Sequence, residues 1–253
     1  MGTDRDWKRW GDSDPYFGVL SDEAYRGERL DADARKAFFA TGVAHVQSVL
    51  STLRTQFDPE FLPGRSLDFG CGVGRVLLPL ARASVVEAVG VDISPAMIDE
   101  CARNAAEQGV DNVRLVQSDE SLSAVDGQFD LVHSHIVLVH IPPDRGMRYL
   151  SALAGKVAPG GFIAVQILCA CNASWPIRAI VRASYRFPPL NWLRNLLRGR
   201  PMRQPAMQLH VYPLARVMSQ LADQGFGPAL LPLDRFPDGS FESVVVIARK
   251  QTA

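Results

Sequence analysis

The sequence predicts a doubly wound α/β fold, in which one sheet of seven strands carries helices on both faces and has an antiparallel last strand. Three observations predict it. Short apolar runs alternate with helical patterns from residue 65 to residue 168, a glycine-rich turn joins the first run to its helix, and two further runs flank a Pro-Asp-Gly-Ser turn near residue 240. Strands that alternate with helices form parallel sheets, whereas a hairpin adds an antiparallel strand.

The composition favours one compact domain with appendages, because 47% of the 253 residues are hydrophobic. The formal net charge is zero, so no global field favours nucleic acid as a partner. The first residues are polar and resemble no signal peptide, and no apolar run is as long as a membrane span, so we expect a cytoplasmic protein. Cys71, Cys101, Cys169 and Cys171 are expected to be free thiols, with no metal site.

Residues 1–60 are expected to form an N-terminal arm and a cap helix. The arm is polar but carries interspersed aromatic side chains, among them Tyr16 and Phe17. Apolar residues then recur at helical spacing over residues 33–57, and the helix ends at the prolines that follow. Two interpretations of the arm remain open: a cap over a ligand cleft, or a strap packed on the outside of the sheet.

The glycine-rich turn follows a short buried strand that ends near Asp68. Gly70, Gly72 and Gly74 come at alternate positions, and residues 75–83 have a helical pattern. Glycines permit a tight turn and let a ligand approach the backbone closely. The spacing differs from the G-x-G-x-x-G of dinucleotide-binding enzymes. The preceding acid repels phosphate and suits a cationic group such as an ammonium.

A second strand is predicted over residues 85–92, and it ends in Asp92. Ser94, followed by proline, is a strong helix start and predicts a helix over residues 95–108. A third strand is expected over residues 113–117. Asp92 stands where this type of fold places an acid against ribose hydroxyls, and a carboxylate offers two acceptor oxygens to adjacent hydroxyls.

A fourth strand is expected over residues 129–134, followed by a segment, 135–141, that also lies at the sheet edge. Paired prolines then open a helix that reaches residue 157. A Pro-Gly-Gly turn at 159–161 leads into a fifth strand over residues 162–168.

Together, the acid–glycine turn, Asp92, Asp119 after the third strand and the Pro-Gly-Gly turn resemble the motifs of class I S-adenosylmethionine (SAM)-dependent methyltransferases. The resemblance covers residues 65–168 by motif. It implies a Rossmann-like core over residues 61–168, with an N-terminal helical cap and an inserted helical lid after strand 5.

The same resemblance implies SAM as the cofactor and S-adenosyl-L-homocysteine as its product. In such proteins the glycine turn lines the methionine part, Asp92 takes the ribose, and Asp119 accepts from the adenine amino group. The cofactor-binding residues that it implies are Asp68, Gly70, Cys71, Gly72, Gly74, Asp92, Ile93, Met97, Ser118, Asp119 and Ser134.

Residues 169–210 form an insertion rich in arginine and aromatic residues. The sequence contains no Asp or Glu between Arg145 and Ala222. Three interpretations remain open: a lid that recognises an anionic or lipid-linked substrate, contact with a membrane surface through residues 175–203, or a solvated arginine face that packs on the protein itself. Residues 211–253 are expected to complete the core with a helix over 213–224 and strands over 229–236 and 241–249.

Methyl transfer needs a general base only if the acceptor must lose a proton. Histidine is suited to that role near neutral pH, and the catalytic candidates are His140 first and His135 second. His133, within the strand, is the weakest candidate. The substrate-binding candidates are Tyr16, Phe17, Arg178, Arg182, His210 and Tyr212.

The predicted function is therefore methyl transfer from SAM to a small-molecule oxygen, nitrogen or carbon, with an anionic or lipid-linked acceptor favoured by the arginines. The segment after the fourth strand lacks the Asn/Asp-Pro-Pro-Tyr-like motif that holds planar amino groups, which argues against nucleobase acceptors. The alternatives are a non-catalytic SAM-binding or scaffold protein and, with less support, an NAD-dependent oxidoreductase. The sequence does not specify the oligomeric state.

Overall fold

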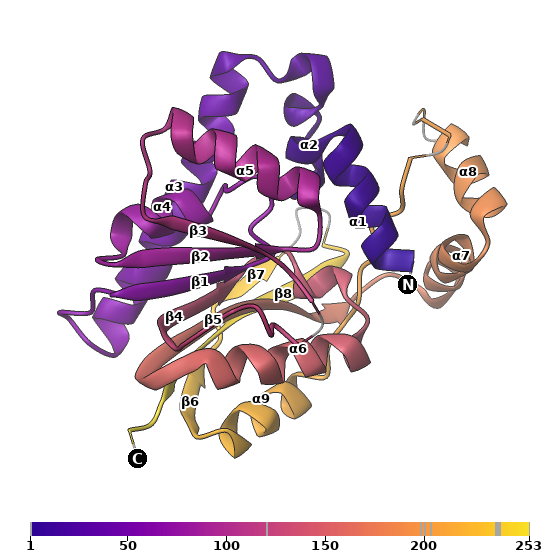
Figure 1. The fold of residues 1–253 in the computed structure, drawn as a ribbon. Coiled ribbons are helices and arrows are strands. Elements are labelled where there is room, and N and C mark those ends of the chain that lie inside the picture. The colour runs from indigo at the N-terminus through magenta and orange to yellow at the C-terminus, as the bar shows by residue number, and fades with distance from the viewer. Residues whose placement is uncertain are drawn as a thin grey trace.

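A computed structural model describes residues 2–119, 121–197, 199, 201–202, 204–235 and 239–252. Its centre is a mixed sheet with the strand order β3-β2-β1-β4-β5-β8-β6, and the short β7 also pairs with β8 (Figure 1). The first five strands run parallel, and β8 is antiparallel to β5, β6 and β7. The strands are β1 Arg65–Phe69, β2 Glu87–Asp92, β3 Val113–Gln117, β4 Phe129–Ser134, β5 Val157–Cys171, β6 Phe226–Leu230, β7 Leu233–Arg235 and β8 Phe241–Lys250.

The predicted fold class is confirmed, but the elements differ from the prediction at two places. The fifth strand was predicted over 162–168 after a turn at 159–161, whereas β5 begins at Val157 and includes these residues, with a register shift against β4 there. The second difference is at the predicted sixth strand. The sequence pattern indicated one strand over residues 229–236, but the structure divides it into β6 and β7. Pro232 lies between them and has no N–H to give to the ladder, although its carbonyl still accepts from Val245 N. Residues 236–238, where the strand end and the hairpin turn were predicted, lie outside the described residues.

Helices cover both faces of the sheet (Figure 1). On one face lie α3, α4 and α5, and on the other lie α6 and α9. Two helices, α1 and α2, lie over the edge where the parallel strands end, and α7 and α8 project beside them. The helices are α1 Gly2–Ser13, α2 Pro15–Val19, α3 Ala32–Gln56, α4 Leu77–Ala83, α5 Pro95–Glu107, α6 Pro143–Lys156, α7 Trp175–Arg186, α8 Pro188–Leu197 and α9 Leu214–Asp223.

The N-terminal arm is more helical than the sequence pattern indicated. Charged residues dominate α1, so no broad apolar face marks it in the sequence, yet the helix buries Trp10 almost completely, at 2% exposure. Packing against the body of the protein, rather than intrinsic propensity, stabilises such a helix. The arm is thus a cap over the sheet edge and not a strap along the outside of the sheet.

The strand order reverses between β1 and β4, which are neighbours at the centre of the sheet. At such a switch point the loops that follow the two strands diverge to opposite faces and leave a crevice. The glycine turn follows β1, and the segment 135–141 follows β4. The fold therefore places these two segments, together with the end of β2, at one site beneath α1.

Candidate functional site

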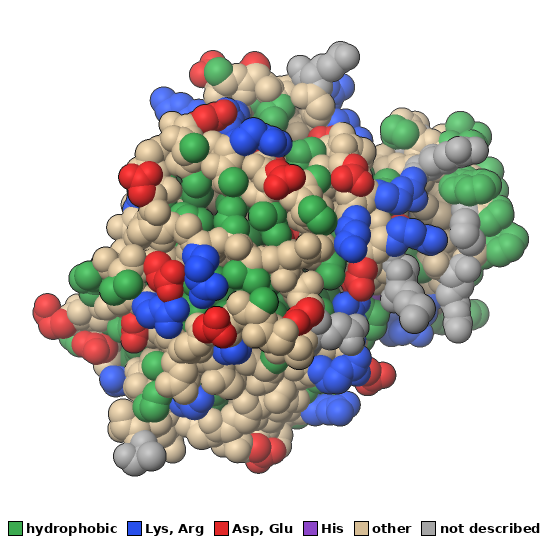
Figure 2. Space-filling view, viewed as in Figure 1, with side chains coloured by type: hydrophobic (Ala, Val, Ile, Leu, Met, Phe, Trp, Pro, Cys, Tyr) green, Lys and Arg blue, Asp and Glu red, His purple; other side chains and the backbone are tan. Residues whose placement is uncertain are grey.

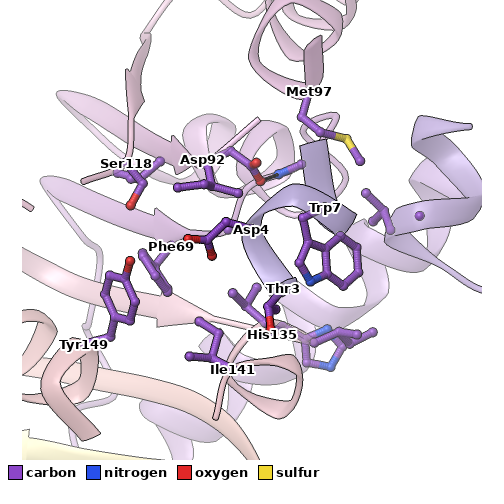
Figure 3. A pocket seen from close by; sticks show the side chains of 18 of the residues that line it. Thr3, Asp4, Trp7, Phe69, Asp92, Met97, Ser118, His135, Ile141 and Tyr149 are labelled. Atoms are coloured by element: carbon purple, nitrogen blue, oxygen red, sulfur yellow. Dashed lines mark hydrogen bonds between the residues drawn. The ribbon is translucent and has the colours of Figure 1, made fainter. Parts of the chain in front are cut away.

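A cavity of about 100 Å³ lies at the carboxyl ends of β1, β2 and β4, with α1 as its cover (Figure 3). Pockets that hold small ligands measure about 300–1,000 Å³. The α1 side chains Thr3, Asp4 and Trp7 point into the site from one side and occupy part of it. A ligand of nucleoside size therefore needs α1 to move outward.

The glycine turn contributes its bare backbone to this cavity. Gly70 and Gly72 line it with φ of +76° and +52°, in the left-handed region that other residues rarely adopt. A Cβ at Gly70 would lie 2.3 Å from Val137 Cγ2, and one at Gly72 would lie 2.6 Å from Val19 Cγ2. Glycine is thus required at both positions by conformation and by space.

Asp92 lies opposite this turn at the end of β2. Its Oδ2 accepts from Gly72 N at 3.0 Å, and its Oδ1 accepts from Ser94 N at 2.9 Å. Burial raises the pKa of Asp92 to about 6, although the backbone N–H donors act in the opposite direction. Each carboxylate oxygen keeps a further lone pair for a ligand hydroxyl. Ile93 and Met97 also line the cavity, as does Ser118 at the end of β3.

The structure corrects the expected position of Asp119. This side chain does not line the cavity but accepts from Ser121 N and Ser123 N, both at 3.0 Å, and from the two hydroxyls. These bonds, led by that from the Ser123 hydroxyl, lower the pKa of Asp119 to about 2. The carboxylate stabilises its own turn, and Ser118 is the residue of this segment that reaches the cavity.

Asp68 also lies away from the cavity lining. Its side chain is buried, and its Oδ1 accepts from His133 Nδ1 at 2.8 Å. The Nε2 of His133 lies 2.9 Å from the Nε2 of His45, a residue of α3. Asp68, which the sequence pattern assigned to a ligand ammonium, is thus already engaged at one end of a hydrogen-bonded chain, Asp68–His133–His45, beneath the glycine turn.

Three more of the predicted cofactor residues form the wall behind the turn rather than its surface. Cys71 is buried, and a hydrogen bond with Cys101 together with burial raises the pKa of its thiol well above the usual value. A Cβ at Gly74 would lie 2.8 Å from Cys101 Sγ, so this glycine permits close packing of α5. The Ser134 hydroxyl donates to Phe69 O at 3.0 Å and joins β4 to β1.

His135 lines the cavity, but its hydrogen bond argues against the predicted role as a base. The buried Arg75 guanidinium donates to His135 Nδ1 at 3.0 Å. Since an arginine can only donate, Nδ1 uses its lone pair on Arg75, and the proton of the neutral ring lies on Nε2. Burial lowers the pKa of His135 well below its usual value. The side chain therefore offers the cavity a donor and not a proton acceptor.

His140 lies behind the cavity rather than on its surface. The ring of Trp7 lies 4.8 Å from its ring, centre to centre, and separates it from the cavity. Its Nδ1 donates to Gln208 O at 2.7 Å, and burial lowers its pKa to about 4. His140 is thus neutral at pH 7, with the Nε2 lone pair not used by the bond to Gln208.

The six predicted substrate-binding side chains do not line this cavity. The Tyr16 hydroxyl donates to Glu100 and contacts Asn104, and Phe17 packs under the Arg26 guanidinium. Tyr212 is buried and bonded to the carbonyls of Leu138 and Ile141. These aromatic residues hold in place the cap and the short 3-10 helix η3, Leu138–His140. Three polar candidates remain, of which Arg178 and Arg182 are exposed on α7 and His210 is half-buried.

The sequence did not single out the cavity residues on α1 and α6. Asp4 Oδ1 and Arg145 Nη1 lie 2.5 Å apart, and Arg145 also donates to the Tyr149 hydroxyl. This ion pair joins the cap to α6 across the mouth of the cavity. The sequence pattern that could have indicated the α1 residues is the spacing of tryptophans in a polar arm. That spacing marks one buried face of a helix, but it does not say which other helix the face packs against.

We expect the protein to lose stability on acidification from pH 6.5 to pH 4.5. Burial lowers the pKa of His45 to about 2, that of His140 to about 4 and that of His135 well below 6.5, so the unfolded chain takes up protons that the folded one refuses. Below pH 6.5, each of these histidines lowers the free energy of unfolding by about 1.4 kcal/mol per pH unit. Asp92, whose pKa is raised to about 6, raises the free energy of unfolding over the same range, but it is one group against three. Urea unfolding at pH 7.5 and pH 5 measures this; equal free energies of unfolding would contradict it.

Residues 67–161 match a family model described as "Methyltransferase domain". The magnesium-protoporphyrin O-methyltransferase of Synechocystis is 33% identical over 142 residues, which are 55% of this chain and 60% of that protein. A 23S rRNA (uracil-C5)-methyltransferase of Alkalilimnicola ehrlichii is 43% identical over 105 residues, 41% of this chain and 23% of that protein. The aligned part of the chain thus spans less than two thirds of either relative.

A crystal structure of the Synechocystis magnesium-protoporphyrin IX methyltransferase with bound SAM superposes with a TM-score of 0.61. The superposition covers 99% of this chain and 98% of that one, at 19% sequence identity. It shows that the two chains share their fold.

Proposed function

Residues 67–161 match the methyltransferase domain family, which is of the class I, SAM-dependent type. We propose that this protein transfers a methyl group from SAM to a small-molecule acceptor. The observation that carries the proposal is the pairing of the bare glycine turn with Asp92 across one cavity. The turn lets the methionine part of SAM approach the backbone, and Asp92 accepts from the ribose hydroxyls. In this proposal residues 61–168 and 211–253 form the catalytic core, and 1–60 form its cap.

The chain's own residues suit a donor that is already activated. A sulfonium methyl group needs only an aligned acceptor and an environment without water, so positioning supplies most of the catalysis. Ile93 and Met97 offer apolar walls to the adenine, and Ser118 offers a polar group at its edge. Trp7 closes the site above them.

His140 is our proposed proton acceptor for a hydroxyl, thiol or amine substrate. Outward movement of α1 removes Trp7 from the ring of His140, and the hydrogen bond to Gln208 keeps the Nε2 lone pair free. The relatives named above act on a porphyrin and on RNA, and the neutral charge of this chain favours the small molecule.

The test is transfer of label from radioactive SAM to a cell extract, followed by mass spectrometry of the labelled product. Labelled small molecules support the proposal, and labelled RNA or protein overturns it. SAM binding in calorimetry without any transfer favours the non-catalytic alternative, whereas stabilisation by NAD but not SAM favours the oxidoreductase. His140→Gln in the same assay reports whether a base is used: transfer at the wild-type rate removes His140 from that role.

Replacing Asp4 by Asn is expected to speed association of SAM about two- to fivefold, because the ion pair holds the ligand-free cap closed and a partly exposed pair contributes a few tenths to 1 kcal/mol. Stopped-flow tryptophan fluorescence, to which Trp7 contributes together with the three other tryptophans, measures the association rate. Asp12→Asn, an exposed carboxylate on the same helix that makes no ion pair within the described residues, is the matched control. An unchanged rate in Asp4→Asn would show that the pair does not hold the cap closed.

A further inference from the structure

The hairpin of α7 and α8 exposes large hydrophobic side chains to solvent. Trp175 is 77% exposed, Leu196 64% and Leu197 79%. Figure 2 shows hydrophobic side chains gathered on this projecting lobe. Further exposed members of the patch are Ile177, Ile180, Phe187, Trp192, Leu193 and Met202. Contiguous exposed apolar surface of this kind marks an interaction site.

The orientation of α8 shows that the exposure is built into the hairpin. Trp192, Leu193, Leu196 and Leu197 follow helical spacing and share one face, which is exposed. The opposite face carries Asn191 and Asn195, which are buried and donate to backbone carbonyls of residues 202 and 204. The polar side thus anchors the helix, and the apolar side faces outward, the reverse of an ordinary surface helix.

The charged side chains that the hairpin's own segment carries are all basic. No Asp or Glu occurs between Arg145 and Ala222, and Arg178 and Arg182 are exposed on α7. In Figure 2 basic side chains lie between the apolar lobe and the body of the protein, with acidic side chains of the body next to them. A tryptophan-containing apolar face beside arginines suits the boundary between lipid headgroups and acyl chains.

We propose that the α7–α8 hairpin docks on a membrane surface that contains anionic lipids. A second copy of the chain fits less well, because a two-fold contact through this face would bring the same arginines of both copies together. No helix within the described ranges is long and apolar enough to cross a bilayer, and docking at the surface does not need one.

The hairpin is coupled to the cap by the segment that follows it. Pro201, Gln204 and Pro205 line a surface hollow together with Arg9 and Trp10 of α1. Docking through α7 and α8 therefore brings the membrane next to the cap. This inference does not depend on the proposed methyl transfer.

The experiment is co-sedimentation of the full chain with vesicles of phosphatidylcholine alone and with vesicles that also contain phosphatidylglycerol. We expect binding to the anionic vesicles, weakened by salt, and a loss of at least about tenfold in the Leu196→Ser/Leu197→Ser variant, whose exposed side chains are dispensable for folding. Val86→Ser, at 60% exposure outside the hairpin, is the control and should bind as wild type does.

Arg178→Gln/Arg182→Gln should weaken binding to anionic vesicles and abolish most of the salt dependence. Absence of binding to either vesicle overturns the proposal. Equal binding to neutral and anionic vesicles overturns the role of the arginines. Sedimentation velocity supplies the last test: a dimer that Leu196→Ser/Leu197→Ser abolishes would assign the face to a second copy instead.

Discussion

Replacing Asp92 by Asn is expected to weaken SAM binding about 100-fold. Hydrogen bonds to a charged acceptor contribute about 1.5–3 kcal/mol, and in the proposed complex both ribose hydroxyls donate to the Asp92 carboxylate. Asn keeps the shape of the side chain and one acceptor oxygen. It also replaces the other oxygen by a donor, which then faces Gly72 N or Ser94 N. The substitution thus disturbs the binding of SAM and, to a smaller extent, the turn that approaches it.

Isothermal titration calorimetry at pH 8 measures this effect, because Asp92, with a pKa of about 6, is ionised there. Asp119→Asn is the matched control: the sequence motif predicts a loss of affinity for both substitutions, whereas the position of Asp119 in its own turn predicts little change. Equal losses would mean that the turn rearranges around SAM. Wild-type affinity in Asp92→Asn would contradict the assignment of the cavity to this cofactor.

Replacing Gly42 by Ala is expected to lower the free energy of unfolding by about 2–3 kcal/mol, the usual cost of forcing atoms into a packed core. In most helix interiors this change is stabilising, by roughly 1 kcal/mol. Here a Cβ would lie 1.8 Å from the carbonyl oxygen of Arg75 and 2.7 Å from its carbonyl carbon, which are backbone atoms. They can move away only if α3 separates from the segment that follows the glycine turn.

Urea unfolding followed by circular dichroism measures the change. Gly155→Ala, near the end of α6 with no heavy atom within 4 Å of the added Cβ, is the control and should leave stability equal or slightly higher. Because Arg75 lies between Gly42 and His135, the Gly42→Ala variant should also bind SAM more weakly. If both variants were equally stable, α3 would not be packed this closely against the turn.

The sequence determined the elements of the core and their order. The strand over 113–117 and the strand over 129–134 were predicted at their observed bounds, and Ser94 was predicted as the N-cap that the structure shows. These features depend on periodicity, capping and turn chemistry, which act within a few residues. For the same reason Gly70, Gly72 and Asp92 could be assigned to the site from their places after β1 and β2.

Only the tertiary structure decided which of the candidate side chains face the cavity. Asp68 and His133 are paired with His45, His135 is bonded to Arg75, and Asp119 is folded back on its own turn. The cap residues Asp4 and Trp7, more than a hundred residues from their partners on α6 and η3, left no recognisable motif. The physical reason is the range of the interactions: a motif fixes the path of its own backbone, but the direction of a side chain depends on distant segments that compete for its hydrogen bonds and its space.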